Sequence, residues 1–344
     1  MGKAIGIILA ALATGWAFDL LNVPAGWLLG ALLTGLVFGL GQSGVRYDGL
    51  PFKLALALVG ANIGLLMSQE LFMIIGMYIG PLAVTLILTL AAGFLLGWLL
   101  YRWSGILNKR TAFFCCIPGG ASEIISISTE YDADERIVAA FHTARITLFV
   151  LMIPFLAGVW HEQNSGVNGA GQVIEASNVL TGSHIAVFII AIGGAMLLNR
   201  FVKIPAGALL FAIAFGFIFG EFVFGIDSVP AYVGGIGQGL IGVMVGVRFD
   251  RLTLFRLMTI GKVSFGILGL YGLFSFLSAY VFWMLSDVTY IVSLLSVVPA
   301  GAAEMSATAF ALDQEPTLVA SLQIIRVVSI FATLPLLLWV IRRI

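Results

Sequence analysis

Charged side chains are scarce in this 344-residue chain: Asp, Glu, Lys and Arg make up 10% of it, whereas 60% of the residues are hydrophobic. A soluble domain cannot bury so much apolar surface. Acidic and basic residues number 17 each, so no net positive charge indicates binding of nucleic acid. The composition therefore predicts a protein whose main surroundings are the lipid bilayer.

Cysteine and histidine are also rare. The two cysteines, Cys115 and Cys116, are adjacent in an apolar stretch, and the three histidines are scattered. Adjacent cysteines provide no disulfide framework, and copper or iron chemistry needs a cluster of His or carboxylate ligands. We expect no resident metal, no cofactor and no enzymatic activity.

The same pattern occurs twice in the chain, at a shift of 181 positions, the distance from Pro118 to Pro299. The shift aligns Pro118, Gly120, Ala121, Glu123 and Arg145 with Pro299, Gly301, Ala302, Glu304 and Arg326. It also aligns 24–26 with 205–207, and Gly60 with Gly242 after a slip of one residue. Helix packing alone explains recurring small residues, but it does not explain a repeated acid and arginine.

Apolar runs of helical length fill both halves. They lie at 3–21, 24–41, 50–67, 71–101, 111–131, 136–160, 183–200, 205–225, 232–248, 257–286, 288–311 and 316–341. Because a helix needs about 20 residues to span a bilayer, we expect an all-α integral membrane protein. The first run resembles a signal peptide, but its internal partner at 185–198 predicts a retained helix. The predicted parts are a first repeat at 1–162, an extracytoplasmic connector at 163–182 and a second repeat at 183–344.

Loop charges indicate how these runs cross, because cytoplasmic loops carry the excess of Lys and Arg. Twelve crossings would divide the basic residues almost evenly between the two sides. A re-entrant hairpin in the fifth run of each half makes every loop Lys and Arg cytoplasmic, together with both termini. Each repeat then has about five transmembrane helices, so the repeats are inverted and their hairpin tips meet near the midplane. The alternative is a broken helix that crosses completely, with a different segment failing to span.

A helix break is expected at the tip of each hairpin. Proline lacks an amide hydrogen, and the glycines after Pro118 accept backbone angles that other residues resist. Non-helical backbone at this depth indicates a cavity, and the new helix presents free amides that can hold an anion. The candidate substrate-binding residues at the breaks are Gly119, Gly120, Ala121, Ser122, Gly301 and Ala302.

Glu123 and Glu304 lie in the first turn after each break. One interpretation is that each carboxylate caps its helix, and the other is that it binds a coupling H⁺ or Na⁺. Ser126 and Ser306 add oxygen atoms nearby, although hydroxyls in membrane helices often bond only to their own backbone.

Arg145 and Arg326 lie too deep in their helices to reach water easily, so each needs a carboxylate, helix carbonyls or an anionic ligand. They either form structural pairs with the two glutamates or bind a substrate carboxylate, which suits guanidinium geometry. His142 lies one turn before Arg145 and is either a proton relay or a hydrogen-bonded interior residue.

These features resemble the AbrB family of bacterial multi-pass membrane proteins. The resemblance rests on the duplication, on 23–26 before a Leu- and Gly-rich run, and on the segments starting at Pro118 and Pro299 with their downstream Arg and Pro. It implies a bacterial inner membrane. The family has been linked to regulation of gene expression and also labelled an ammonia monooxygenase, a label that three scattered histidines do not support.

The break after Pro118 is also similar to that of bile acid:sodium symporters and of the wider cation/proton antiporter and anion transporter group, which implies an elevator or rocking mechanism. We expect secondary transport of a small organic anion coupled to H⁺ or Na⁺. The alternative is a membrane receptor that affects gene expression indirectly without transport. A homodimer is compatible with an elevator-like protein, and no residue decides the substrate or the oligomeric state.

Overall fold

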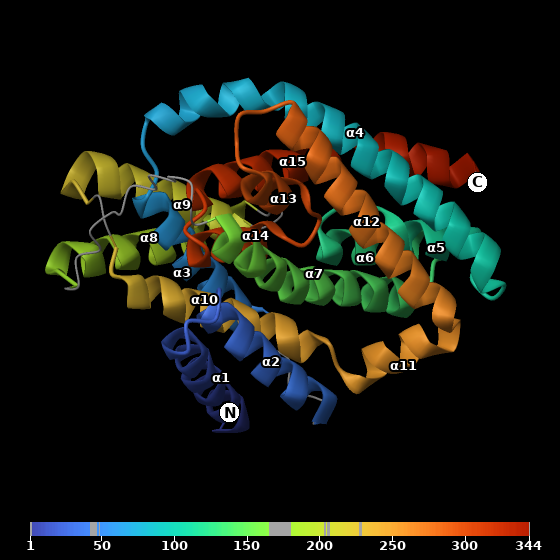
Figure 1. Cartoon of the computed structure of the whole chain (residues 1–344), viewed down its shortest axis with the longest axis horizontal. Coiled ribbons are helices and arrows are strands. Elements are labelled where there is room, and N and C mark those ends of the chain that lie inside the picture. Colours follow the sequence, from blue (N-terminus) through green and yellow to red (C-terminus); the bar gives the residue numbers. More distant parts are fainter. Residues whose placement is uncertain are drawn as a thin grey trace.

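A computed structural model describes residues 2–41, 47, 49–164, 180–202, 204, 207–226 and 229–343, and the regular elements among them are all helices (Figure 1). The first half contains α1 (Gly2–Leu20), α2 (Gly26–Gly41), α3 (Leu50–Leu65), α4 (Glu70–Ser104), α5 (Lys109–Cys116), α6 (Ala121–Glu130) and α7 (Glu135–Asn164). The second half contains α8 (Gly182–Phe201), α9 (Gly207–Phe219), the π-helix η1 (Gly220–Phe224), α10 (Ala231–Arg248), α11 (Arg251–Ile260), α12 (Lys262–Met284), α13 (Tyr290–Val297), α14 (Ala302–Ala311) and α15 (Pro316–Arg343).

Helix starts recur at the shift seen in the sequence. The starts of α2, α3, α4, α5, α6 and α7 each precede by 181 positions those of α9, α10, α11, α13, α14 and α15. One pair differs: α4 is continuous through Pro81, whereas its counterpart is divided into α11 and α12 at Gly261, which has a φ of +82°. The predicted single run at 257–286 is therefore two helices. A glycine tolerates this positive φ where other residues are strained.

Glycines bring the two halves together. Gly242 on α10 packs against the Leu28 carbonyl of α2, and Gly60 on α3 packs in the same way against the Leu209 carbonyl of α9, so neither position has room for a Cβ atom. Leu209 lies 181 positions after Leu28. The α2–α10 contact thus recurs as the α9–α3 contact with the two halves interchanged, as in a two-fold arrangement. Small residues allow this close approach.

The first broken segment returns to the side from which it starts. Before α5, Asn108 Nδ2 donates to the Asp132 carbonyl at 3.1 Å, and Arg110 on α5 forms an ion pair of 3.0 Å with the Asp132 carboxylate beyond α6. The hydroxyl oxygen of Thr111 accepts a hydrogen bond from the Asp134 amide at 2.8 Å. The beginning of α5 therefore lies beside the end of α6, as in a re-entrant hairpin.

The second broken segment closes in the same way. Thr289, directly before α13, donates a hydrogen bond of 3.4 Å to the side-chain oxygen of Gln314, which follows α14. Entry and exit of the α13–α14 segment are again adjacent. Both segments have the hairpin geometry rather than that of a broken helix that crosses completely.

Seven helices among the described residues are long and apolar enough to cross a membrane, or eight if the pair of α10 and α11, bent by 52°, counts as one span. The seven lie in α1, α4, α7, α8, α9 with η1, α12 and α15. The other predicted crossings fall on α2 and α3, which have 16 residues each, and on α10. The chain is thus a multi-pass all-α membrane protein.

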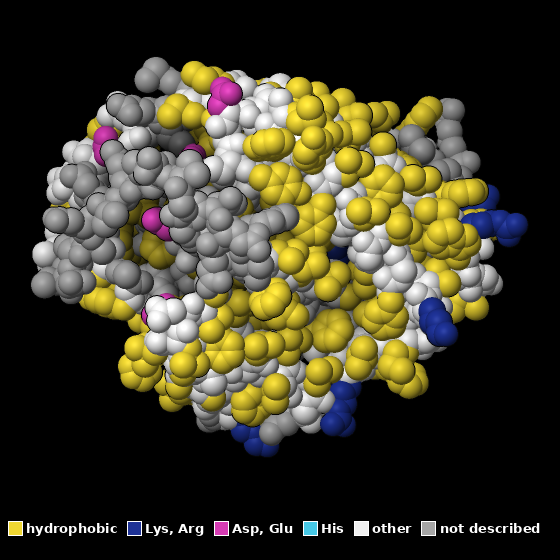
Figure 2. Space-filling model, in the orientation of Figure 1, with side chains coloured by type: hydrophobic (Ala, Val, Ile, Leu, Met, Phe, Trp, Pro, Cys, Tyr) yellow, Lys and Arg dark blue, Asp and Glu magenta, His cyan; other side chains and the backbone are white. Residues whose placement is uncertain are grey.

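Charged side chains are segregated on the face shown in Figure 2, with Lys and Arg along the right and lower edges and Asp and Glu toward the upper left. In the same orientation the N-terminal end lies at the bottom and the C-terminal end at the right (Figure 1). This segregation agrees with loop charges that gather on one side of a membrane.

Candidate functional site

The first helices of both hairpins end with the same backbone conformation. Ile117, which follows α5, has φ and ψ of −66° and 128°, and Val298, which follows α13, has −64° and 130°. Each precedes a proline, whose ring disfavours the helical conformation in the residue before it. The second helices begin at Ala121, as predicted, and at Ala302.

In the first half, two side chains of α7 hold the end of α5. His142 Nε2 lies 3.0 Å from the Phe114 carbonyl oxygen, and Arg145 Nη1 donates to the Ile117 carbonyl oxygen at 3.5 Å. Because a carbonyl only accepts, Nε2 carries the proton, and Nδ1 accepts from Arg145 Nη2 at 3.1 Å. These partners favour the interior interpretation of His142 over the proton relay.

In the second half, two side chains of α15 hold the end of α13. Gln323 Nε2 donates to the carbonyl oxygens of Leu295 and, at 3.1 Å, Val298. Arg326 Nη1 donates to the carbonyl oxygens of Val297 and, at 2.7 Å, Val298. The contacts of His142 and Arg145 thus recur 181 positions later, although Gln replaces His.

Both arginines therefore lie at helix C-termini, where the negative end of the helix dipole stabilises a positive charge. The described ion pairs do not join Arg326 to Glu304, so backbone carbonyls take the place of the structural Arg–Glu pair considered for the second half. The side chains of Ser122 and Glu123 lie outside the part of the structure that is described, as do residues 165–179 of the predicted connector. The corresponding pair of the first half stays a prediction.

Glu304 lies at the start of α14 with 6% of its surface exposed. Its carboxylate bonds to its own backbone amide and packs against Gly301, which has a φ of +104° and no room for a Cβ atom. Arg248, at the end of α10, is the basic residue within electrostatic reach. The fold thus buries a carboxylate in the first turn after the break.

The candidate hydroxyls bond within their own helices. Ser306 donates to the Ala302 carbonyl at 2.6 Å and Thr308 to the Glu304 carbonyl at 2.8 Å, both fully buried. Ser126, the candidate on α6, is exposed. Among the described residues, no group of three or more His, Cys, Asp or Glu side chains gathers in a way that could hold a metal ion.

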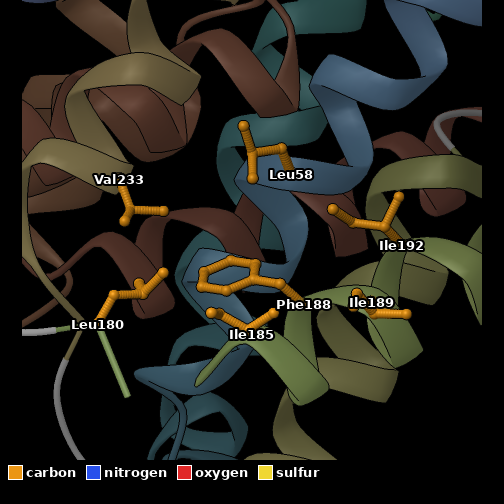
Figure 3. Close-up of a pocket in the computed structure, with 7 residues that line it drawn as sticks. All are labelled: Leu58, Leu180, Ile185, Phe188, Ile189, Ile192 and Val233. Atoms are coloured by element: carbon orange, nitrogen blue, oxygen red, sulfur yellow. The ribbon is translucent and has the colours of Figure 1, made fainter. Parts of the chain in front are cut away.

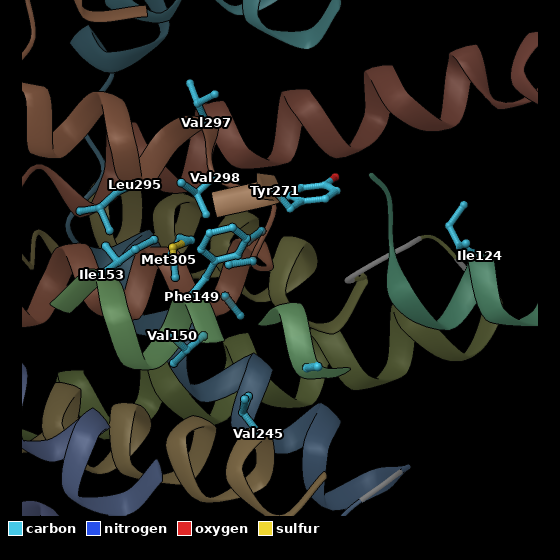
Figure 4. Packing of buried hydrophobic residues seen from close by; sticks show 14 of the residues in the cluster. Ile124, Phe149, Val150, Ile153, Val245, Tyr271, Leu295, Val297, Val298 and Met305 are labelled. Atoms are coloured by element: carbon cyan, nitrogen blue, oxygen red, sulfur yellow. The ribbon is translucent and has the colours of Figure 1, made fainter. Parts of the chain in front are cut away.

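Tyr271 on α12 joins the site and was missed by the sequence reasoning. Its ring lies 4.9 Å from the Arg145 guanidinium carbon and 6.5 Å from the ring of Phe149. Its hydroxyl is buried beside Arg145, and it interacts electrostatically with both Arg145 and Arg326. Figure 4 shows this hydroxyl at the end of the ring that points away from Val298. The sequence feature that could have indicated this residue is a tyrosine at the position where the first half has Leu90.

The two buried arginines at the hairpin tips place charges of the same sign near each other. Arg145 and Arg326 are 3% and 4% exposed, their Nε atoms have no hydrogen-bond partner, and the two guanidinium groups act on each other. Among described side chains, no carboxylate pairs with either arginine. One positive charge from each half is therefore buried at the hairpin tips, together with the phenol of Tyr271.

The described cavities are separate from this site. A cavity of about 200 Å³ touches Ala302, but Ile324, Val327 and Val328 line it from a face of α15 other than that of Arg326. An open pocket of about 490 Å³ between α3 and α8 has an apolar lining, as Figure 3 shows. Neither of these two cavities is lined by Arg145 or Arg326.

Comparisons with known proteins agree on the family. The family model described as "Transition state regulatory protein AbrB" matches residues 27–342. The chain is 28% identical to "Uncharacterized protein YhjN" of Bacillus subtilis (strain 168), with 97% of this chain and 91% of the relative covered. It is 22% identical to "Putative regulator AbrB" of Escherichia coli (strain K12), with 92% and 90% covered. The chain with these paired hairpins and arginines therefore belongs to the AbrB family of membrane proteins.

Proposed function

We propose that this protein is a secondary active transporter of a small organic anion. The observation that supports the proposal is the pair of buried arginines, one from each half, which meet at the hairpin tips without a described carboxylate partner. Uncompensated charge at membrane depth costs at least a few kcal/mol. A bound anion would supply a negative charge to both arginines.

The roles of the site residues follow from their partners. Arg145 and Arg326 use part of their donor capacity on carbonyls, and their Nε atoms stay available to an acceptor. The helix starts at Ala121 and Ala302, with Gly119, Gly120, Ser122 and Gly301 at the breaks, add backbone amides. A substrate carboxylate between the arginines accepts from both halves at once.

Coupling to H⁺ or Na⁺ is assigned to the acids of the same tips. Glu304 is buried beside the break, and Ser306 shares its helix. In the first half, Glu123 is the corresponding acid, Ser126 lies on the same second helix, and His142 is kept as a secondary candidate for proton transfer. No resident cofactor and no catalytic step are part of the proposal.

Alternating access would move one group of helices against another. The glycine contacts of α2 with α10 and of α3 with α9 form a tight group that suits a scaffold. The two hairpins pack on α4, α7, α12 and α15, which would form the moving core with them, and α14 also contacts α2, α3 and α10 of the scaffold. We place the protein in the bacterial inner membrane with both termini cytoplasmic, without a nucleic acid partner, and as a homodimer.

Flux into proteoliposomes tests this function. Purified protein is screened with small carboxylates and amino acids under an Na⁺ or a pH gradient, and binding is followed by thermal stabilisation. We expect one class of anion to be transported by the wild type and lost in Arg145→Gln and Arg326→Gln. Arg145→Lys and Arg326→Lys keep the charge and serve where the Gln variants do not fold. Folded Gln variants with full flux would show that the arginines are not the substrate site.

A receptor that binds the anion without moving it is the second candidate. The names of the family model and of the Escherichia coli relative, both of which refer to regulation, favour it. The same experiment separates the two: stabilisation by an anion with no flux in either gradient would support the receptor. Any effect on gene expression would then be indirect.

A further inference from the structure

A second polar site lies at the membrane surface, away from the hairpins. A pocket of about 450 Å³ is lined by Leu50 and Lys53 at the start of α3 and by Met196, Asn199 and Arg200 at the end of α8. Both basic side chains are exposed, and none of the described residues that line the pocket is acidic. Two positive charges from different halves thus line one cavity, and its described lining holds no carboxylate.

The position of this pocket matches a lipid headgroup. Arg200 is the penultimate residue of a candidate membrane span, Gly182–Phe201, and Lys53 lies in the first turn of α3. Leu50 is 61% exposed, and together with Met196 it offers an apolar wall beside the charges. Cations, an amide and aliphatic surface at a helix end are the groups that contact the phosphate, glycerol and first acyl carbons of a phospholipid.

The duplication provides an internal comparison. The residues 181 positions from Lys53 and Arg200 are Gly234 and Asp19, so the related place in the other half has no basic residue and one acid. Gly234 has no room for a Cβ atom beside Phe310 and Asn62, so packing excludes a Lys there, whereas Asp19 is exposed and only its charge differs from that of Arg200. The basic pocket is therefore specific to one end of the molecule.

We propose that this pocket binds the phosphate headgroup of an anionic phospholipid, with Lys53 and Arg200 as its cationic contacts and Asn199 as an amide donor. Zwitterionic lipids share the phosphate but carry a compensating ammonium group, which two cations disfavour. Binding would fasten α3 to α8 at the membrane surface. The site is independent of the arginine cluster and of transport.

Thermal unfolding in detergent tests the site with four probes: phosphatidylglycerol, cardiolipin, phosphatidylcholine and inorganic phosphate. We expect the anionic lipids to raise the Tm of the wild type in a saturable way, and phosphatidylcholine to have little effect. Lys53→Gln combined with Arg200→Gln should weaken the apparent affinity for the anionic lipids by on the order of tenfold or more. The matched control, Arg102→Gln combined with Lys262→Gln, removes the same charges from exposed positions outside the pocket and should respond like the wild type.

Three outcomes would overturn the proposal. Equal stabilisation of the pocket variant and the wild type would place lipid binding elsewhere, and an equal loss in the control variant would reduce the effect to net charge. Stabilisation by inorganic phosphate as strong as by the lipids would identify a site for free anions. The Tm of each variant in phosphatidylcholine reports whether it is folded.

Discussion

The two hairpins have the same sequence signature and different surroundings. In α14, residues 302–309 are all buried, and the helix packs on α2, α3, α7, α10 and α15. In α6, Ile124 and Ser128 are buried, Ser126 is exposed, and the helix packs on α5 and α7. A duplicated chain with unequal burial has adopted an asymmetric conformation. In a transporter, this is the difference expected between an enclosed half-site and one that is open to its own side of the membrane.

The tips differ in backbone as well. Gly120 has a φ of −64°, which any residue adopts, whereas its counterpart Gly301 has a φ of +104°. At the second tip, the Glu304 carboxylate lies directly against Gly301. The second tip therefore has a backbone conformation that only glycine adopts readily, whereas the first tip has one that is open to other residues.

The largest effect is expected at this pair of glycines. Gly301→Ala places a Cβ at a strained φ and against the Glu304 carboxylate, so we expect a loss of about 1–3 kcal/mol of stability. Gly120→Ala, the matched control, should change stability by less than about 1 kcal/mol. Thermal or denaturant unfolding in detergent measures both. Equal losses would show that the backbone difference between the tips is not maintained in solution.

The second helices of the two hairpins, α6 and α14, should also differ in their accessibility to a labelling reagent, and this effect is expected to be smaller. Ser126→Cys and Ala307→Cys occupy equivalent positions, and Ala307 is 1% exposed. In detergent we expect a maleimide to label the Ser126 variant on the order of tenfold faster, because the other site must open first. The parent protein controls for Cys115 and Cys116, which are 2% and 1% exposed. Similar rates would contradict the enclosed state of α14, whereas a substrate that reverses the order would support alternation.

The smallest effect is expected from a substitution that gives one half the residue found at the equivalent position of the other half. His142→Gln introduces the residue that bonds the equivalent carbonyl in the second half, so stability should fall by less than about 1 kcal/mol. His142→Ala leaves the Phe114 carbonyl without its partner and should cost about 1–3 kcal/mol. Unfolding of the two variants side by side gives the difference. A Gln variant as unstable as the Ala variant would mean that the paired contacts are not equivalent.

Much of the site was predictable because it depends on local chemistry. The composition gave the membrane class, and the matched Pro, Gly, Glu and Arg positions gave the breaks and their arginines. Tyr271 was not predictable, since the Arg145 that it contacts belongs to the other half of the chain and the repeat has Leu90 at the equivalent position. The partners of the two arginines could not be predicted either, because a carbonyl and a carboxylate can both satisfy a buried guanidinium.

By itself, the sequence determined where helices end, because proline and glycine act through the backbone of their own neighbours, and it determined the duplication. The tertiary structure decided that each broken segment returns on itself, through contacts such as that between Arg110 and Asp132. It also decided which of two equal signatures is enclosed. Burial depends on what packs against a helix from elsewhere in the chain, and two nearly equivalent halves fold into one asymmetric body only when those contacts form.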